Sequence, residues 1–311
     1  MTFQSVELIN VITIYDMKND NIAIGVDIGG TNIRAGAVYA DGSLIGESFS
    51  VSTNATESKE LILSRIVDSI SRIITQNKLS ISDIQGIGLG CTGPLDVKKG
   101  LILECPNLPT MDFFPLRSEI EKAFNLPVFM NNDANAMMLG ESRWGAGKGA
   151  CSVLGITLGT GFGCAIILNQ KIWMGATETA GEIWISPYRD GFIEEVVSGA
   201  GVSKLYESLT GLKASSKQIA HLAIEGDQFA KTVWEEFGKA VAFALSWSIN
   251  LLDPEIVIIG GSISNAMPLF FQSLHDALVK SICPVPAENL KIVKAQLGDN
   301  AGFIGAAALV F

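Results

Sequence analysis

The sequence predicts an α/β protein made of two similar halves that face each other across a cleft. Its 311 residues exceed the length of one typical domain, which favours two domains. Hydrophobic residues make up 48% of the chain and charged residues 17%, a balance typical of a folded protein rather than a disordered one. A plan of strand, glycine bend, strand and turn over residues 24–46 recurs over residues 155–175, which indicates an internal duplication.

The first half is predicted to open with a β-hairpin. An apolar run reaches Asp27, passes through Gly29 and Gly30, and continues into a second apolar run that turns back at residues 40–43, Ala-Asp-Gly-Ser. Alternating apolar residues joined by an Asp-Gly turn are typical of two antiparallel strands. A P-loop or a dinucleotide-binding motif places a helix after its glycines, so both of these readings are disfavoured.

The glycine bend suits a phosphate group. Glycines let backbone N–H groups approach an anion closely, and the hydroxyl group of Thr31 adds a donor. Asp27 would repel that anion unless a cation stood between them, which predicts Mg²⁺ associated with Asp27 through water or phosphate. The open alternative is a tight bend alone, with Asp27 facing solvent.

Helices and strands alternate through the rest of the first half. Apolar residues recur at helical spacing over residues 61–77, which predicts an amphipathic helix. A buried strand over residues 83–90 ends at a sharp loop that contains Gly93 and Pro94. The elements expected next are a short strand at 101–103, a helix at 115–124 and a strand at 126–130.

A polar strand end follows at Asn131-Asn132-Asp133, immediately before a helix-forming run over residues 134–141. Open α/β sheets bind ligands at the carboxyl ends of their strands, so Asp133 is a candidate catalytic group. Asp and Asn are also favoured N-caps of helices. The two roles are compatible, because capping fixes the orientation of a side chain.

The second half repeats the opening hairpin. Residues 155–161 form a strand and a glycine bend, residues 162–168 a second strand, and residues 171–175 a third. Thr157 stands in the place of Asp27, Gly159 in that of Gly29, and Gly161 in that of Thr31. Two phosphate-contacting bends across one cleft are therefore expected, with chance recurrence in glycine-rich sequence as the alternative.

A third glycine pair, Gly260-Gly261, ends the buried strand predicted at residues 255–262. Such a pair leaves room for an adenine or ribose group beside the backbone, and a structural turn is the competing reading. The remaining elements expected are helices at 201–210, 216–225, 227–252, 268–282 and 301–311, and an edge strand at 290–295.

Composition excludes several classes of function. The net charge of −10 opposes general affinity for nucleic acid or anionic membranes, and no apolar run approaches the roughly 18 residues of a membrane helix. Five cysteines without metal-ligand spacing are expected to be reduced thiols in the cytoplasm. Residues 1–21 lack the features of a signal peptide and are expected to be an N-terminal extension, with Met17 as a candidate start.

In this order, the Asp-x-Gly-Gly-Thr hairpin, the Asn-Asn-Asp strand end, the Leu-Gly-Thr-Gly bend and the Ile-Gly-Gly-Ser turn resemble the ROK family of repressors and sugar kinases. The resemblance implies the duplicated actin-like ATPase (ribonuclease H-like) fold. It also implies a small domain of residues 22–132 plus a C-terminal helix at about 300–311, a large domain of residues 133–299, a cleft for sugar and ATP, and a homodimer.

The resemblance also implies roles for individual residues. Asp133 matches the catalytic base of the family. Matches to its sugar contacts are Gly93, Pro106, Asn107, Asn132, Glu182 and Glu194. Matches to its two phosphate loops are Asp27, Gly29, Gly30, Thr31 and Asn32 in the first, and Thr157, Gly159, Thr160 and Gly161 in the second. Gly260 and Gly261 match its adenosine loop.

The chain departs from the family pattern after Glu182. Ile183-Trp184 stands in place of a Gly-His step, and Pro187–Phe192 replaces a run of zinc-binding cysteines. A zinc site is therefore not expected. The absent histidine would contact the sugar near its anomeric end, so a preference for glucose is less secure. Trp184 either stacks on a sugar face or packs.

The predicted function is ATP-dependent phosphorylation of a hexose, at its primary 6-hydroxyl group, with Asp133 as the base. Glucose, mannose, fructose, allose, an N-acetylhexosamine and a β-glucoside are all compatible with two glutamates and an Asn-Asp pair. A sugar-sensing repressor is a second reading, but it requires a basic DNA-binding module, and the first 23 residues hold one Lys and no Arg. A sugar-binding protein without catalysis is the third.

Overall fold

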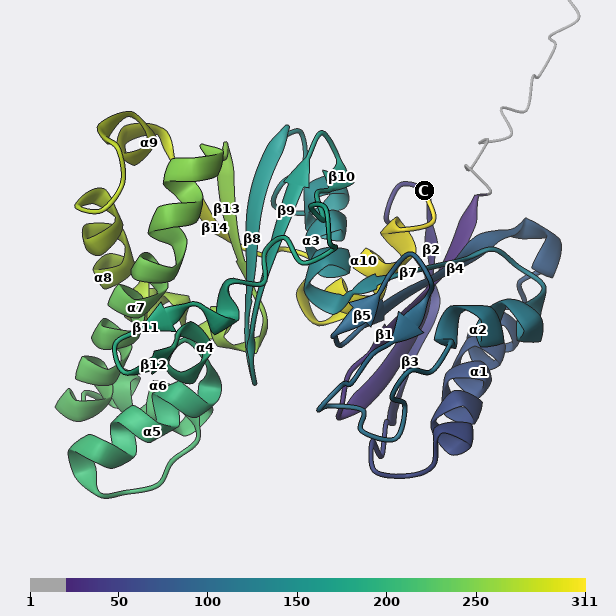
Figure 1. The fold of residues 1–311 in the computed structure, drawn as a ribbon, viewed down its shortest axis with the longest axis horizontal. Helices are drawn as coiled ribbons and strands as arrows, with labels where there is room; N and C mark the ends of the chain where they lie inside the picture. Colours follow the sequence, from purple (N-terminus) through teal and green to yellow (C-terminus); the bar gives the residue numbers. More distant parts are fainter. Residues whose placement is uncertain (1–20) are drawn as a thin grey trace, which may run out of the picture.

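The computed structural model describes residues 21–311, which form two lobes that each contain a five-stranded sheet (Figure 1). Of the predicted N-terminal extension, residues 1–20, Met17 included, lie outside the described residues. Among residues 21–311, no helix combines the length and the apolar character needed to cross a bilayer.

The first sheet has the strand order β3-β2-β1-β4-β7. The first three strands pair antiparallel as the predicted hairpin and its extension, whereas β4 and β7 run parallel to β1. These strands are β1 (Ile22–Ile28), β2 (Asn32–Tyr39), β3 (Leu44–Ser52), β4 (Ile84–Cys91) and β7 (Val128–Asn132). A small hairpin of β5 (Leu95–Asp96) and β6 (Leu101–Ile102) follows β4.

Helices cover both faces of this sheet. On α1 (Lys59–Gln76), four isoleucines at positions 62, 66, 70 and 73 are fully buried, as the helical spacing predicts. Helix α2 (Leu116–Phe124) packs beside α1 in the same hydrophobic core. The last helix, α10 (Ala301–Ala308), contacts β1, β2 and β4. A Cβ atom on Gly25 of β1 would overlap the backbone of Phe303, so only glycine allows this approach.

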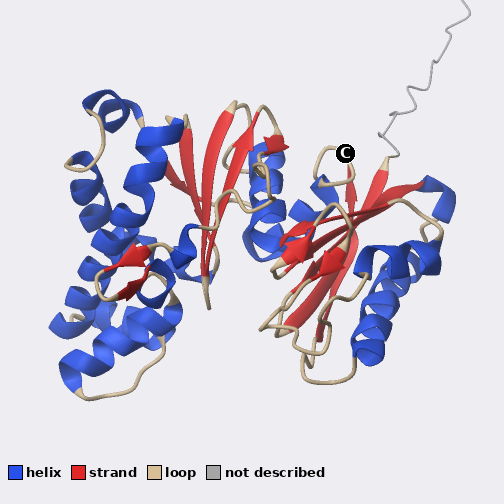
Figure 2. Ribbon diagram, viewed as in Figure 1, coloured by secondary structure: helices blue, strands red, loops and turns tan. Residues whose placement is uncertain are grey.

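The second sheet repeats the plan, with the order β10-β9-β8-β13-β14 (Figure 2). Three antiparallel strands come first, and two strands parallel to β8 follow. They are β8 (Ser152–Leu158), β9 (Phe162–Leu168), β10 (Lys171–Ile172), β13 (Ile256–Gly260) and β14 (Lys291–Lys294). The predicted internal duplication is thus present in the topology, and the alternative of chance recurrence is wrong.

The helices of the second lobe pack on one face of its sheet. They are α4 (Ile193–Val196), α5 (Gly199–Thr210), α6 (Ser216–Glu225), α7 (Gln228–Leu252), α8 (Met267–Val279) and α9 (Pro284–Asn289). Helix α7 is the long buried helix predicted from its apolar period. Its Trp234 and Phe237 pack against Phe270 of α8, so these aromatic side chains form core.

Helices α3 (Asp133–Trp144) and α10 lie between the two sheets (Figure 1). They approach closely, since a Cβ atom on Gly140 would lie 2.8 Å from the Cα atom of Gly305. The fully buried carboxylate of Glu141 accepts hydrogen bonds from the amides of Ala146, Gln296 and Leu297. Helix α3 is therefore held rigidly, and its first residue is positioned with it. The division between domains at residue 133 remains a prediction.

Several predicted elements extend beyond the observed ones, among them the helix expected at 268–282, which ends at Val279, and the edge strand expected at 290–295, which covers Lys291–Lys294. The strand expected at 171–175 ends at Ile172, before Gly175 turns the chain with a φ of 73°. The strand expected at 255–262 covers Ile256–Gly260, because Gly261 adopts a φ of 79°. The helix expected at 301–311 ends at Ala308.

Candidate active site

At the junction of β7 and α3, one residue caps the helix and its neighbour is the catalytic candidate. The N-cap of α3 is Asn132, whose side-chain oxygen accepts from the amides of Ala134 at 2.9 Å and Asn135 at 3.4 Å. Asp133 is the first helical residue, and its Oδ1 accepts from the amide of Ala134 at 2.8 Å. Asn132 satisfies the helix end, so Asp133 keeps its second oxygen for another partner.

Asp133 has an increased affinity for a proton. Burial raises the pKa of its carboxyl group, although the amide of Ala134 and the side chain of Asn132 act in the opposite direction. A general base is most effective when its pKa lies closer to the working pH than that of an ordinary carboxylate. The geometry and the direction of the shift therefore both suit proton transfer.

Asp27 lies near Asp133, on β1, opposite Arg34 of β2. Burial, and then the charge of Asp133, raise the pKa of Asp27 to about 7, with Arg34 partly offsetting this. The first turn of α10 approaches closely, because a Cβ atom on Gly302 would lie 2.3 Å from Oδ2 of Asp27. Asp27 is therefore largely enclosed, with part of its side chain still accessible. Two neighbouring carboxylates without a cation repel each other, so this position suits a divalent ion.

The first glycine bend is held by its own backbone and by Thr53, the residue that follows β3. The amide of Gly29 donates to the carbonyl of Asn32 at 3.0 Å, and the Thr53 hydroxyl group donates to the Gly29 carbonyl at 2.6 Å. Within residues 21–311, the amides of Gly30 and Thr31 donate to no other group. The bend therefore presents two free N–H groups beside Asp27, as a phosphate site requires.

The second glycine bend has the same character. The amide of Gly159 donates to the carbonyl of Gly161 at 3.0 Å, and the amide of Gly199 donates to the carbonyl of Gly159 at 2.8 Å. The amides of Thr160 and Gly161 have no acceptor in the described part of the chain. A Cβ atom on Gly163 would lie 2.4 Å from the Thr157 hydroxyl oxygen and 2.7 Å from the Cβ of Ala134, so this glycine lets the second hairpin meet the start of α3.

The third glycine pair packs against the second bend. A Cβ atom on Gly261 would lie 2.3 Å from the carbonyl oxygen of Leu158, and its backbone is in the left-handed region. A structural turn therefore accounts for Gly261. The side chain of Ser262 reaches within 3.7 Å of the Cβ position of Gly159. Gly260 and Gly261 thus lie beside a phosphate-type bend, and their contact with adenosine stays a prediction.

The predicted sugar contacts gather around the same centre. Asn107 donates through Nδ2 to the hydroxyl oxygen of Thr92 at 3.1 Å, and its carbonyl oxygen lies 2.9 Å from the Cβ position of Gly30. A Cβ atom on Gly93 would lie 3.5 Å from Nδ2 of Asn132. Pro106 is exposed and directly precedes Asn107, and its contact with a sugar stays a prediction.

The two predicted glutamates are near each other and near Asp133. Partial desolvation raises the pKa of Glu182, the charges of Asp133 and Glu194 add to this, and a hydrogen bond from Trp184 opposes it. Glu194 accepts from the amide of Phe162 at 2.8 Å, so one of its oxygens already binds the second glycine bend. Glu194 therefore connects the predicted sugar contacts to the second glycine bend.

Trp184 has a role that neither sequence reading anticipated. Its indole Nε1–H donates to Oε2 of Glu182 at 2.5 Å, while 37% of the residue remains exposed. The ring is too exposed to belong to the hydrophobic core, and its hydrogen bond gives it a function besides any stacking on a sugar. It orients a carboxylate, in a segment where the chain departs from the ROK pattern.

Other neighbours of the site were not identified from the sequence. Arg34 and Gly302 contact or influence Asp27, and Thr92 accepts from Asn107. The cross-strand position of Arg34 was the one available signal, because residues that face each other in a hairpin are predictable from its turn. Gly302 and Thr92 are brought in by distant segments and leave no local signal.

The segment that replaces the zinc cysteines forms a small hairpin of β11 (Pro187–Tyr188) and β12 (Gly191–Phe192). All five cysteines are free. Among residues 21–311, no group of three or more His, Cys, Asp or Glu side chains is arranged to hold a metal ion. An Mg²⁺ ion would accordingly rely on one carboxylate and on ligand phosphates, as such ions commonly do.

Comparisons with known proteins find relatives over almost the whole chain. The family model of the ROK family matches residues 23–311. A glucokinase of Halalkalibacterium halodurans is 32% identical over 94% of this chain and 96% of its own length, and a glucokinase of Thermotoga maritima is 31% identical over 92% and 96%. A xylose repressor of Caldicellulosiruptor bescii is 28% identical over 94% of this chain and 79% of its own length.

Solved structures with the same fold include a ROK hexokinase from Thermus thermophilus, with a TM-score of 0.81, 28% identity and coverage of 93% of this chain and 97% of that one. A ROK family glucokinase from Streptomyces griseus, in complex with glucose and AMPPNP, has a TM-score of 0.78, 29% identity and coverage of 93% and 98%. The predicted actin-like ATPase fold is thereby confirmed.

Proposed function

Because this chain belongs to the ROK family, we propose that it is a sugar kinase that transfers the γ-phosphate of ATP to the 6-hydroxyl group of a hexose. The observation that carries the proposal is the position of Asp133, which has a raised pKa and lies beside Asp27 at the rigid start of α3. The glucokinase relatives and the neighbour that binds glucose and AMPPNP support the same activity and the use of ATP.

In this mechanism, Asp133 accepts the proton of the sugar hydroxyl group as the oxygen attacks the γ-phosphorus. The new O–P bond forms while the bond from the γ-phosphorus to the β,γ-bridging oxygen breaks, and ADP leaves with that electron pair. Phosphoryl transfer depends chiefly on positioning and on stabilisation of charge. The free amides of Gly30, Thr31, Thr160 and Gly161 supply donors for phosphate oxygens.

Asp27 fits a magnesium ion because its carboxylate is beside free amides and another carboxylate. The bound ion would neutralise charge on the phosphates. Glu182 and Glu194 would accept hydroxyl groups of the sugar, with Asn132, Asn107 and Gly93 lining the remainder of its site. Gly260 and Gly261 would border the adenosine.

The proposal is tested by measuring ADP release with MgATP and a panel of sugars that includes glucose, mannose, fructose, allose and N-acetylglucosamine. We expect at least one of them to stimulate ADP release well above the sugar-free rate, and NMR of the product to place phosphate on O6. An absence of stimulation by every sugar would refute the proposal.

A sugar-sensing regulator is the second candidate, favoured by the xylose repressor among the relatives. The net charge of −10 of this chain opposes binding to the polyanion DNA. Sugar-dependent retention of DNA fragments in a gel, without sugar-dependent ADP release, would favour the regulator. Sugar binding with neither activity would indicate a catalytically silent protein.

Replacing Trp184 by phenylalanine should raise KM for the sugar by about tenfold, because it removes a hydrogen bond to a charged carboxylate, and kcat should change less than threefold. Loss of this donor also raises the pKa of Glu182, so the acidic limb of the sugar KM profile should move to higher pH. The control is Phe229→Leu, since Phe229 is 52% exposed at the start of α7. An unchanged KM and pH profile would exclude the positioning role of Trp184.

We also propose that the protein is a cytoplasmic homodimer. Phe243, Trp247 and Leu251 recur every four residues on α7 and are exposed, which supports a second copy packing there. Light scattering should give twice the mass of the chain, and the double variant Trp247→Glu, Leu251→Glu should give the mass of one chain. A single-chain mass for the unaltered protein would contradict the dimer.

A further inference from the structure

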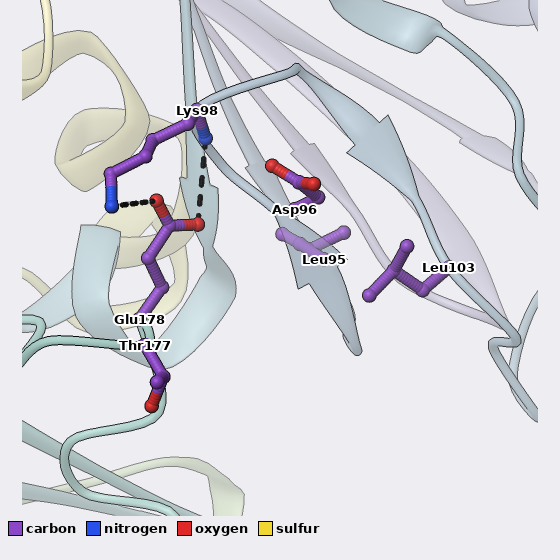
Figure 3. Close-up of a pocket in the computed structure, with 6 residues that line it drawn as sticks. All are labelled: Leu95, Asp96, Lys98, Leu103, Thr177 and Glu178. Carbon is purple, nitrogen blue, oxygen red and sulfur yellow. Dashed lines mark hydrogen bonds and ion pairs between the residues drawn. The ribbon is translucent and has the colours of Figure 1, made fainter.

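A pocket lies between the β5–β6 hairpin of the first lobe and the loop of residues 175–182 of the second (Figure 3). Its volume is about 260 Å³, and its walls combine apolar and charged groups from both lobes. They are Leu95, Asp96, Lys98, Leu103, Thr177 and Glu178. Sites for drug-sized ligands typically measure roughly 300–1,000 Å³, so this pocket suits a group no larger than a single sugar ring.

The pocket adjoins the proposed sugar site. Leu95 follows Gly93 by two residues, which limits their separation to about 7 Å at roughly 3.5 Å per residue. The amide of Leu103 donates to the carbonyl of Pro94 at 3.0 Å, so the other strand of the hairpin is held beside the same loop. Glu178 precedes Glu182 by four residues, within about 14 Å. A substituent on a hexose bound near Gly93 and Glu182 would therefore reach the pocket.

Glu178 is the unusual residue of its wall. Its φ is 66°, in the left-handed region that non-glycine residues seldom adopt, and such strain concentrates at functional sites. Its side chain is 9% exposed and accepts from the amides of Val97 at 2.7 Å and Lys98 at 3.4 Å, the second of which is drawn in Figure 3. The other oxygen, Oε1, is buried and accepts no hydrogen bond, although the ammonium group of Lys98 lies 3.6 Å away.

A buried carboxylate oxygen without a hydrogen bond costs stability unless a ligand supplies the donor. The hydrogen bonds that join Glu178 to the first lobe use Oε2 alone, which accepts from the amides of Val97 and Lys98. Oε1 therefore has only the ion pair with Lys98 at 3.6 Å, and its capacity to accept a hydrogen bond is unused. A sugar hydroxyl group is a donor of suitable size, and the two leucines offer the apolar surface that one face of a sugar ring covers.

We propose that this pocket is an outer carbohydrate subsite, which holds a glycosyl group attached to the hexose away from the hydroxyl group that Asp133 deprotonates. The preferred substrate is then a disaccharide or a related glycoside rather than a free hexose. Glu178 Oε1 accepts a hydroxyl group of the outer ring, and Lys98 donates to another. This inference rests on the proposed kinase function and specifies its substrate class.

The test compares glucose with cellobiose and maltose, by ADP release and by titration calorimetry, on the full chain. We expect one of the disaccharides to exceed glucose at least tenfold in kcat/KM and in affinity. Replacing Leu103 by tryptophan should fill the pocket and lower the ratio of disaccharide to glucose at least tenfold. Replacing Glu178 by glutamine should lower that ratio about threefold to tenfold. The control is Leu212→Trp, at an exposed position after α5.

Phosphorylation of glucose without any preference for a disaccharide would overturn the subsite and leave the kinase proposal standing. A ratio that Leu103→Trp and Glu178→Gln leave unchanged would also overturn it, and Glu178 would then act only as a clamp between the lobes. If no sugar is phosphorylated, the kinase proposal fails. Calorimetry still tests the subsite in that case. Tighter binding of a disaccharide than of glucose, lost in Leu103→Trp, would support the subsite. Equal binding of the two sugars would overturn it.

Discussion

Replacing Asp133 by asparagine is expected to lower kcat for sugar phosphorylation by at least about 10²-fold, because the variant cannot accept the proton of the attacking hydroxyl group. The asparagine oxygen can still accept from the amide of Ala134, and Asn132 still caps α3. The fold and the affinity for sugar should therefore be preserved. ADP release under saturating substrates measures the loss, and calorimetry with the sugar measures the affinity.

The pH dependence of the unaltered enzyme provides a second readout of the same residue. Burial raises the pKa of Asp133, so the acidic limb of kcat should lie at higher pH than that of an ordinary carboxylate. In Asp133→Asn this limb should be absent from the residual rate. A variant that phosphorylates sugar at the normal rate, or that keeps the limb, would show that another group is the base. Replacing the exposed Asp68 by asparagine serves as the control.

Replacing Asp27 by asparagine should both abolish efficient use of MgATP and stabilise the protein without ligand at pH 8. The pKa of Asp27 is about 7 in the folded protein and near 3.8 in an unfolded chain, so the folded state favours the protonated form. The stability that this provides is full below pH 3.8 and is lost as the pH rises through 7. At pH 8 the folded protein bears the whole cost of a buried charge, about 4 kcal/mol at most.

Thermal unfolding without nucleotide should therefore show a Tm several degrees higher for Asp27→Asn at pH 8, with the difference shrinking towards pH 4. Activity at saturating sugar should fall at least about 10²-fold at moderate MgATP, because the variant lacks the carboxylate that would hold the cation. Equal Tm values at pH 8 would refute the buried charge, and normal use of MgATP would refute the cation site. Asp68→Asn is again the matched control.

Asp27 and Asp133 are therefore both expected to lower the free energy of unfolding while they serve the proposed reaction. Burial raises the pKa of each, and their mutual repulsion adds to the shift at Asp27. Natural active sites often retain such destabilising groups. This shared property connects the two predictions, because each substitution by asparagine removes a charge from the same poorly solvated place.

Local patterns sufficed for most of the longer helices and strands, but they did not predict the short elements β5, β11, β12 and α9. Apolar residues at helical spacing predicted α1 and α7, and alternating residues around the glycine bends predicted the hairpins of both sheets. The polar strand end predicted Asp133 at the start of a helix, although the N-cap is Asn132. Boundaries were less accurate where a glycine turns the chain, as at Gly175 and Gly261, because the sign of φ is not visible in a periodic pattern.

The sequence by itself determined the order of elements, the duplication and the identity of the bends, since these depend on residues that are neighbours in the chain. The tertiary structure alone decided that Asp27 meets Asp133 and Gly302, that Trp184 holds Glu182, and that Glu178 reaches the amide of Val97. Most of these contacts join segments that are far apart in sequence. Burial and charge at such contacts set the pKa values, and no local pattern encodes them.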